Sequence, residues 1–224
     1  MVRKQKVKVF IMCGGYYTNF DYPKSLTVIN GEKLLDRTIR LLSAYEVEPL
    51  VCCNPDESAF DEYKPLYCNF TFDYLKQTGY YLDLYHAVPC NVPCIYLFGD
   101  VYYTEEAIES IIAKYDETER NIFICNEYPF NENHLRQGEP FGWIVKDQIE
   151  FRSAVVLCKC LQDRKIVDHA NGVASNWELA HVINGLGIND FNLRREDCLI
   201  IHDKTIDVDD PSVIEKIEKR VKDV

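Results

Sequence analysis

Short apolar runs alternate along the chain with longer stretches in which apolar residues recur at helical spacing. Such runs are typical of parallel strands, because helices cover both faces of the sheet and leave no polar face. The runs that predict strands lie at 6–12, 48–53, 68–73, 93–100, 121–126, 153–160 and 198–203. The alternation predicts a single α/β domain over residues 1–224, with a mostly parallel sheet flanked by helices.

The amphipathic stretches between these runs predict the covering helices. They lie at 33–45, 80–88, 104–116, 176–187 and 210–224. Thr104 and Ser175 are placed to act as N-caps, because a hydroxyl can accept hydrogen bonds from the free backbone N–H groups of a first turn. Pro211 suits the start of the last helix, where its fixed φ fits and its missing N–H is not needed.

One segment, residues 126–152, follows neither the strand nor the helix period. It is rich in Asn, Glu, Gly, Pro and aromatic residues. A break of this kind inside a regular α/β pattern is typical of a functional loop. We expect a lid or insertion there, in the form of a small β-ribbon.

The composition narrows the range of partners. The chain has 36 acidic and 25 basic residues and a formal net charge of -11. A protein with this field repels nucleic acids and acidic membranes, so we expect neither as a partner. The basic N-terminus is followed by only about five apolar residues, too few for a signal peptide or a membrane span, and we expect a cytoplasmic protein. An anionic substrate then needs local positive charge from Lys, Arg or a metal.

The ten cysteines raise the question of a metal site or a disulfide framework. Their spacing contains no C-x-x-C pair and no matching histidine partner. Cys13, Cys52, Cys53, Cys125 and Cys158 lie inside apolar runs. We therefore expect reduced cysteines that serve as small hydrophobic residues in a cytosolic core.

The candidate chemistry gathers at the ends of three predicted strand regions. Gly14 and Gly15 follow the first strand, Asp100 follows a buried strand, and Asp207 and Asp209 follow the last strand region. The glycines permit positive φ and close approach of a ligand to the backbone. Because ligands of parallel α/β sheets bind at the carboxyl ends of the strands, we expect these residues to line one cleft.

Each of these residues also has a structural alternative. A glycine pair can be a tight turn without a ligand, and Lys24 can be a solvated lysine, although Pro23 fixes the backbone before it. Asp100 is a natural Mg²⁺ ligand, and its rival role as a helix cap is already filled by Thr104. Asp210, directly before Pro211, is best explained as a cap.

Together these residues resemble the nucleotidyltransferase superfamily that makes nucleotide-activated sugars and alcohols. "MCGGYYTNFDYPKSL" is similar to the family opening L-A-G-G-x-G-x-R with its following P-K-x-L, and "VINGEKLLDRTI" is similar to the next stretch. "LFGDV" and "IDVDDP" are similar to the settings of its two acidic metal ligands, and "YLDLYHA" resembles a segment of phosphocholine cytidylyltransferases. The resemblance implies a Rossmann-like fold of the GT-A type. It also implies transfer of a nucleoside monophosphate to a phosphorylated sugar or small alcohol, with release of pyrophosphate, for surface glycan or lipid precursors.

The same resemblance implies roles for individual residues. Lys24 and Asp100 would be catalytic, and Asp100, Asp209 and Asp207 would hold Mg²⁺. The nucleotide would be bound by Met12, Cys13, Gly14, Gly15, Asn19, Lys24, Gln77 and Gly79. The opening departs from the family pattern at two positions, since Asn19 stands where the family has an arginine and Tyr17 where it has a second loop glycine.

The segment 126–152 is the candidate for recognition of the acceptor. Its candidate acceptor-binding residues are Arg136, Glu139, Trp143 and Lys146. An aromatic box of Tyr80, Tyr81 and Trp143 could hold a quaternary ammonium by cation–π attraction. The alternative is that these rings belong to the core.

Two other functions fit parts of the pattern. A GT-A glycosyltransferase could use the "DVD" at 207–209 as its metal motif, and a catalytically silent nucleotide-binding relative would account for Tyr17 and Asn19. For the leading interpretation we expect an NTP (CTP, UTP or another), Mg²⁺ and a phosphorylated small-molecule acceptor as partners. A homodimer is compatible with the sequence.

Overall fold

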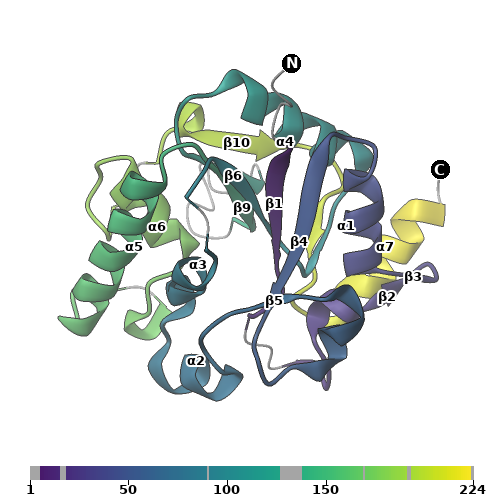
Figure 1. Cartoon of the computed structure of the whole chain (residues 1–224), viewed down its shortest axis with the longest axis horizontal. Coiled ribbons are helices and arrows are strands. Elements are labelled where there is room, and N and C mark those ends of the chain that lie inside the picture. The colour runs from purple at the N-terminus through teal and green to yellow at the C-terminus, as the bar shows by residue number, and fades with distance from the viewer. Residues whose placement is uncertain are drawn as a thin grey trace.

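A seven-stranded sheet forms the centre of the computed structural model (Figure 1), which describes residues 6–15, 19–89, 91–126, 138–168, 170–190 and 193–222. In spatial order its strands are β10 (Cys198–Ile201), β8 (Ile122–Asn126), β9 (Pro140–Val145), β6 (Cys94–Phe98), β1 (Val7–Met12), β4 (Val47–Cys53) and β5 (Leu66–Tyr67). β1 pairs in parallel with both β4 and β6, so these three strands end at the same edge. The predicted α/β fold with a mostly parallel sheet is confirmed.

β9 is the antiparallel strand of this sheet. It pairs with β6 on one side and with β8 on the other. The expectation of a lid or β-ribbon over 126–152 is therefore wrong for its second half, because Pro140–Val145 is a central strand and Gln148 begins a helix. Residues 127–137 lie outside the described part of the chain.

Helices cover both faces of the sheet. They are α1 (Leu34–Leu42), α2 (Phe72–Thr78), α3 (Leu84–Ala87), α4 (Glu105–Glu117), α5 (Gln148–Asp163), α6 (Asn176–Ile183) and α7 (Pro211–Lys222). One core joins α5 and α6 to the sheet through Trp143, Phe151 and Leu179. The core on the other face joins α1 and α4 through Leu35 and Ile108. Figure 1 shows α5 and α6 on one side of the sheet and α1 and α7 on the other.

Two predicted strands are corrected by the structure. Residues 153–160 lie within α5 and form no strand. Residues 68–73 follow the short strand β5 and run into α2, which begins at Phe72. The helix predicted over 80–88 is divided into a 3-10 turn, η3 (Tyr81–Asp83), and α3.

Side-chain caps fix the starts of several helices, among them α4, α6 and α7. The Thr104 hydroxyl accepts a hydrogen bond from the Ala107 backbone N–H at α4. At α6 Ser175 and Glu178 form a reciprocal capping box, which satisfies two free donors at once. Asp210 accepts from the Ser212 backbone N–H at the start of α7, as expected for a cap.

A two-stranded ribbon links the end of the chain to the middle of the sheet. β11 (Ile206–Asp207) pairs antiparallel with β7 (Val101–Tyr102), and Asp207 lies opposite Val101. The Val208 backbone N–H also donates to the carbonyl of Asp100, at 3.0 Å. Residues more than 100 positions apart in the sequence therefore become neighbours.

The nine described cysteines are free thiols, and seven of them are buried as small hydrophobic residues would be. Cys13 is only half-buried, and Cys160 is exposed. Among the described residues, no helix is both long and apolar enough to cross a membrane.

Candidate functional site

The site lies where β1 and β6 end. Gly99 follows β6, and its backbone N–H donates to the Met12 carbonyl at 2.9 Å. A Cβ at position 99 would stand 2.5 Å from the Cys13 sulfur and 3.1 Å from the Met12 carbonyl oxygen. Only glycine therefore lets Asp100 sit this close to the loop after β1.

Three carboxylates meet at this point. One oxygen each of Asp100, Asp207 and Asp209 lies within 4.8 Å of the other two. The ribbon of β7 and β11 carries Asp207 and Asp209 to Asp100. The sequence predicted these three residues as a group, and the structure brings them together.

Lys24 lies between two of these carboxylates. Its Nζ stands 2.6 Å from Asp100 Oδ2 and 2.6 Å from Asp209 Oδ1. Burial alone would lower the pKa of the Lys24 ammonium, but the charges of the three aspartates outweigh it and raise that pKa above its ordinary value. Lys24 is therefore held as a cation at the edge of the acidic cluster.

Asp207 is the least satisfied member of the cluster. Its Oδ1 is buried and has no hydrogen-bond partner among the described residues. Burial, together with the charges of Asp100 and Asp209, raises the pKa of the Asp207 carboxyl well above its ordinary value. Glu139 adds a further carboxylate, since its Oε2 accepts from the Asp207 backbone N–H at 3.3 Å.

This donor set fits a hard divalent cation. Mg²⁺ is bound by oxygen ligands, usually one or two carboxylates together with substrate phosphates. The cluster offers three carboxylates, one of them with a buried oxygen that lacks a partner. The side chain of Asp209 is 73% exposed, which leaves the cluster open to solvent and substrate.

The loop after β1 differs in one respect from the expectation. Neither Gly14 nor Gly15 has a positive φ. Gly14 is required for space, because a Cβ there would stand 2.9 Å from Asn54 Oδ1, and the Asn54 amide donates to the Gly14 carbonyl. Asn19 donates to the Asp209 carbonyl at 3.3 Å, so it connects the end of the loop to the acidic cluster. Tyr17 lies outside the described residues.

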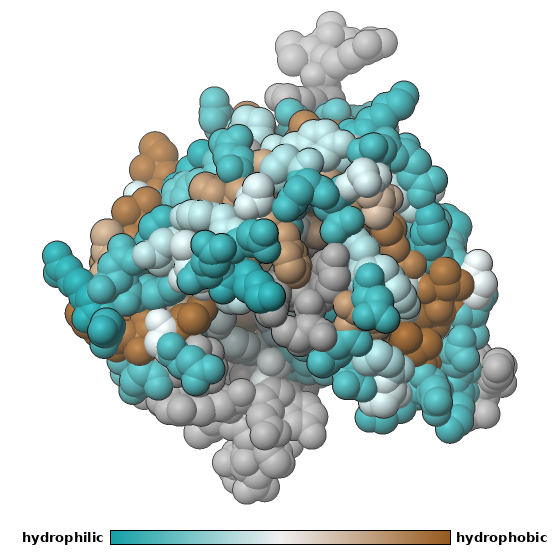
Figure 2. Space-filling model, turned by 90° about the horizontal axis from the view of Figure 1, so that it is seen from below, coloured by the Kyte–Doolittle hydropathy of each residue, from teal (hydrophilic) through white to brown (hydrophobic). Residues whose placement is uncertain are grey.

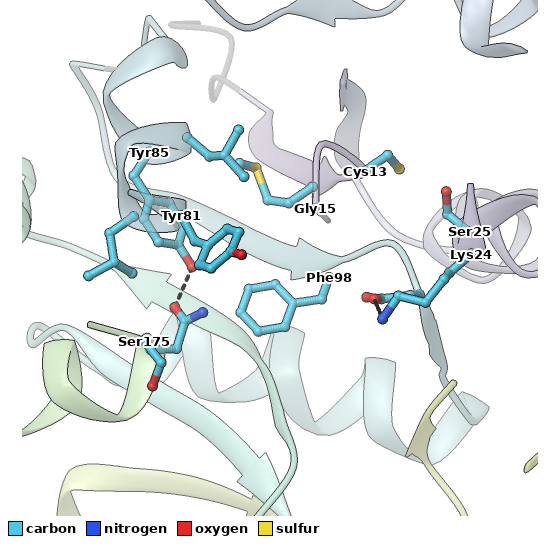
Figure 3. Close-up of a pocket in the computed structure, with 13 residues that line it drawn as sticks. Cys13, Gly15, Lys24, Ser25, Tyr81, Tyr85, Phe98 and Ser175 are labelled. Atoms are coloured by element: carbon cyan, nitrogen blue, oxygen red, sulfur yellow. Dashed lines mark hydrogen bonds and ion pairs between the residues drawn. The ribbon is translucent and has the colours of Figure 1, made fainter. Parts of the chain in front are cut away.

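A cavity of about 340 Å³ extends from the acidic cluster across the end of the sheet. It is lined by Met12, Cys13, Gly15, Lys24, Ser25, Tyr81, Leu82, Leu84, Tyr85, Phe98, Asp100, Ser175 and Asn176. Figure 3 shows Lys24 at one end, Tyr85 and Ser175 at the other, and Phe98 between them. The charged lining residues, Lys24 and Asp100, are both at the first end.

The far end of the cavity is built from neutral polar groups. Asn176 Oδ1 accepts from the Tyr85 hydroxyl at 2.7 Å and from the Trp143 indole N–H at 3.0 Å. Ser175 is occupied by its capping box with Glu178. Sequence reasoning identified Ser175 only as a cap and did not identify Asn176. Position 176 carries no motif, and only the fold brings it to the cavity.

The structure places only some of the predicted acceptor-binding residues near the site. Glu139 lies beside the acidic cluster, and Arg136 falls outside the described residues. Trp143 is fully buried behind the cavity wall, so its expected contact with an acceptor is wrong. Lys146 follows Val145, which pairs with Cys94 at the start of β6, and therefore lies at the opposite edge of the sheet from Asp100. Its ammonium stands 3.7 Å from the centre of the Tyr115 ring.

The aromatic box is also not formed. Besides the burial of Trp143, the Tyr80 ring is already covered by the protein's own Lys159, whose Nζ lies 4.0 Å from the ring centre. Of the three box residues, Tyr81 lines the cavity.

Two predicted nucleotide-binding residues, Gln77 and Gly79, lie on α2 and at its carboxyl end. Gln77 is exposed on α2. Gly79 caps the carboxyl end of α2 with a φ of 67°, and its N–H donates to the Leu75 carbonyl. The cavity lining includes neither residue.

Comparison with known proteins finds a family match for the chain. A family model described as the MobA-like NTP transferase domain matches residues 9–149. This range contains Lys24 and Asp100, and it ends before Asp207 and Asp209. No curated protein matches the chain significantly.

Solved structures share the fold over nearly the whole chain. The 2-C-methyl-D-erythritol 4-phosphate cytidylyltransferase of Thermus thermophilus aligns with a TM-score of 0.55 at 11% identity, covering 97% of this chain and 100% of that one. Rv0371c of Mycobacterium tuberculosis H37Rv gives 0.56 at 14% identity, covering 96% and 98%. Molybdopterin-guanine dinucleotide biosynthesis protein A of Archaeoglobus fulgidus gives 0.50 at 13% identity, covering 97% and 100%. At these identities the likeness shows a common fold.

Proposed function

The chain belongs to the family of MobA-like NTP transferase domains, and we propose that it transfers a nucleoside monophosphate from an NTP to a phosphorylated alcohol or sugar. The observation that carries this proposal is the arrangement of Lys24 among the three aspartates at one end of the cavity. The family match favours nucleotidyl transfer over the glycosyl transfer that the sequence left open.

The reaction forms one bond and breaks one bond. A phosphate oxygen of the acceptor attacks the α-phosphorus of the NTP, and the bond from that phosphorus to the oxygen bridging to the β-phosphate breaks. Pyrophosphate leaves with the electron pair of that bond. Because neither step needs a proton acceptor, catalysis depends on positioning and on neutralising charge.

The residues of the chain supply both requirements. Lys24 is held as a cation in a largely buried position, where it would stabilise the negative charge that develops on the phosphates. The backbone at Met12, Cys13 and Gly15 borders the same cavity and would position the nucleotide. Asn19 offers a neutral amide where the family has an arginine, so Lys24 carries more of the charge stabilisation.

The three aspartates would hold Mg²⁺, which when bound neutralises phosphate charge that a protein of net charge -11 would otherwise repel. Asp207 contributes a buried oxygen that has no hydrogen-bond partner among the described residues. Asp209 contributes an exposed carboxylate, and Asp100 connects the cluster to the cavity. The product class, precursors of surface glycans or lipids, belongs to this proposal.

Pyrophosphate release tests the proposal directly. It would be measured with each of the four NTPs, Mg²⁺ and a panel of phosphorylated alcohols and sugars. We expect release with at least one pair, and a loss on the order of 10²- to 10³-fold in Asp100→Asn. Asp116→Asn, the same change at an exposed position of α4, serves as the control and should retain full activity. The absence of release with every pair, together with no NTP binding by calorimetry, would overturn the proposal. NTP binding without release would instead support a catalytically silent nucleotide-binding relative.

A further inference from the structure

Asn176 has an amide whose orientation is fixed by its partners. Its Oδ1 receives hydrogen bonds from the Tyr85 hydroxyl at 2.7 Å and the Trp143 indole at 3.0 Å. An indole N–H can only donate, so the amide atom that faces it must be the oxygen. Burial raises the pKa of the Tyr85 hydroxyl, which therefore keeps its proton and donates as well.

The two donors are themselves held rigidly. Trp143 is fully buried and Tyr85 is 4% exposed. Both rings pack edge-on against Phe151 of α5, at centroid distances of 5.3 and 5.1 Å. Asn176 is thus held from behind by the core, and Figure 3 draws its hydrogen bond to Tyr85 as a dashed line at the cavity wall.

The other atom of this amide, Nδ2, has no hydrogen-bond acceptor among the described residues, although Asn176 lines the cavity. A fixed donor at a cavity wall discriminates between ligands, because a bound ligand must supply an acceptor there or leave the donor unpaired. We propose that Asn176 recognises a hydroxyl or carbonyl oxygen on the body of the acceptor substrate.

Its place in the chain favours the acceptor over the nucleotide. The family match covers residues 9–149 and ends before α6 begins at Asn176. The acceptor differs from one NTP transferase to another, so a residue that recognises it need not lie within the matched range. Asn176 follows Ser175 and accepts a hydrogen bond from Tyr85, and Figure 3 shows both of these residues at the end of the cavity opposite Lys24. The phosphates would be bound at the Lys24 end.

The lining of the cavity further limits the acceptor. Its charged residues, Lys24 and Asp100, lie at the phosphate end, and the far end offers aromatic rings, leucines and neutral polar groups. A second anionic group on the acceptor would lose its hydration there, and the described residues that line this end offer it no cation. On the basis of the proposed function, the acceptor is therefore a phosphorylated polyol or sugar whose body is otherwise uncharged.

Asn176→Asp is the variant that tests this role. One carboxylate oxygen can still accept from Tyr85 and Trp143, while the other replaces the cavity donor with an acceptor. Calorimetry would measure the binding of each NTP, and of glycerol 3-phosphate, ribitol 5-phosphate, sorbitol 6-phosphate and glucose 1-phosphate, with gluconate 6-phosphate as the anionic counterpart. Asn91→Asp is the matched control, because it adds the same charge at an exposed position just before β6, at the far edge of the sheet.

We expect Asn176→Asp to weaken binding of the preferred neutral acceptor at least about tenfold, with NTP binding unchanged. A second test uses the wild-type protein alone and remains valid if the variant does not fold. Among deoxy analogues of the preferred acceptor, one should bind the wild type more weakly by a comparable factor, because it lacks the oxygen that Asn176 recognises. Unchanged acceptor binding in a folded variant would overturn the inference. Equal weakening of NTP binding, or preference for gluconate 6-phosphate in the wild type, would overturn it as well. Failure of the wild type to bind any NTP would overturn the proposed function instead.

Discussion

Lys24 is the residue whose removal should lower the catalytic rate most directly. It is the cation between Asp100 and Asp209, and its side chain is only 12% exposed. We expect Lys24→Met to lower kcat on the order of 10²- to 10³-fold, because a preorganised charge contact with the phosphates is lost. The measurement is pyrophosphate release at saturating NTP. Lys33→Met, which breaks the more exposed pair with Glu62, should leave the rate unchanged.

Removal of the Asp207 charge should raise stability in the absence of a divalent cation and weaken the proposed binding of Mg²⁺. Its buried oxygen has no partner, and Asp100 and Asp209 repel its charge. Without divalent cation, Asp207→Asn is expected to raise Tm, by about 2 to 4 °C for each kcal/mol of repulsion removed. Under the proposed function, Mg²⁺ is expected to raise the Tm of the wild type, and the same variant should lose that increase. Scanning calorimetry with EDTA and with Mg²⁺ measures both, and a lower Tm in EDTA would contradict the repulsion.

His86 on α3 provides a pH-dependent contribution to stability away from the acidic cluster. Burial lowers its pKa below the ordinary 6.5, and Arg152 and Lys159 act in the same direction against Asp83. The unfolded chain therefore binds a proton more readily, and stability is lost as pH falls below 6.5. Replacement of His86 by Gln should flatten this loss between about pH 6.5 and 5, as measured by urea unfolding at several pH values. An unchanged slope would contradict the assignment.

The sequence predicted some of these residues better than others, and the reason is local. Lys24, Asp100 and Asp209 stand beside Pro and Gly or at strand ends, where the backbone itself marks a turn toward the cleft. Trp143 and Lys146 were expected at the acceptor because their segment resembled a loop. Their true positions depend on strand pairing, which composition does not reveal. Asn176 could not have been found, because its role arises from partners 33 and 91 residues away.

At the scale of elements, the start of α6 connects stability to the cavity. The capping box of Ser175 and Glu178 fixes the turn that carries Asn176. Ser175→Ala should cost about 1 kcal/mol in unfolding free energy and should also raise the KM of the acceptor. Thr104→Ala removes a similar cap from α4 and should cost a similar amount without changing KM. Equal KM effects in both variants would show that the change is general destabilisation.

The error over 153–160 has a cause in the packing of α5. Val155 and Cys158 face the core, but Val156 and Leu157 are also about half exposed. The helix is therefore apolar on more than its buried side, and the helical period disappears from the sequence. Figure 2 shows hydrophobic residues along the left flank of the molecule, the side on which α5 lies in Figure 1. An apolar run with two valines, such as the one at 153–160, is typical of a strand. Only the length of the segment then distinguishes a strand from a helix.

At the scale of the whole molecule, the reactivity of the cysteine thiols tests the packing of both cores. Cys160 is exposed, whereas Cys52, Cys53, Cys94 and others are buried thiols. Iodoacetamide should label Cys160 in the native protein and leave the buried ones unmodified until denaturant is added. Peptide mass spectrometry would locate the label. Because the described cysteines are free, Tm should be the same with and without reductant, and a lower Tm with reductant would contradict this.

The pairing of β7 with β11 determines when, during synthesis of the chain, the three aspartates can come together. Asp100 is translated in the first half of the chain, but Asp207 and Asp209 follow only after another hundred residues. A nascent chain can assemble most of the matched family region while its cation site is still incomplete. Under the proposed function, catalytic competence is expected only after residue 209 has been synthesised, and a copy shortened before residue 206 would lack two of its three aspartates.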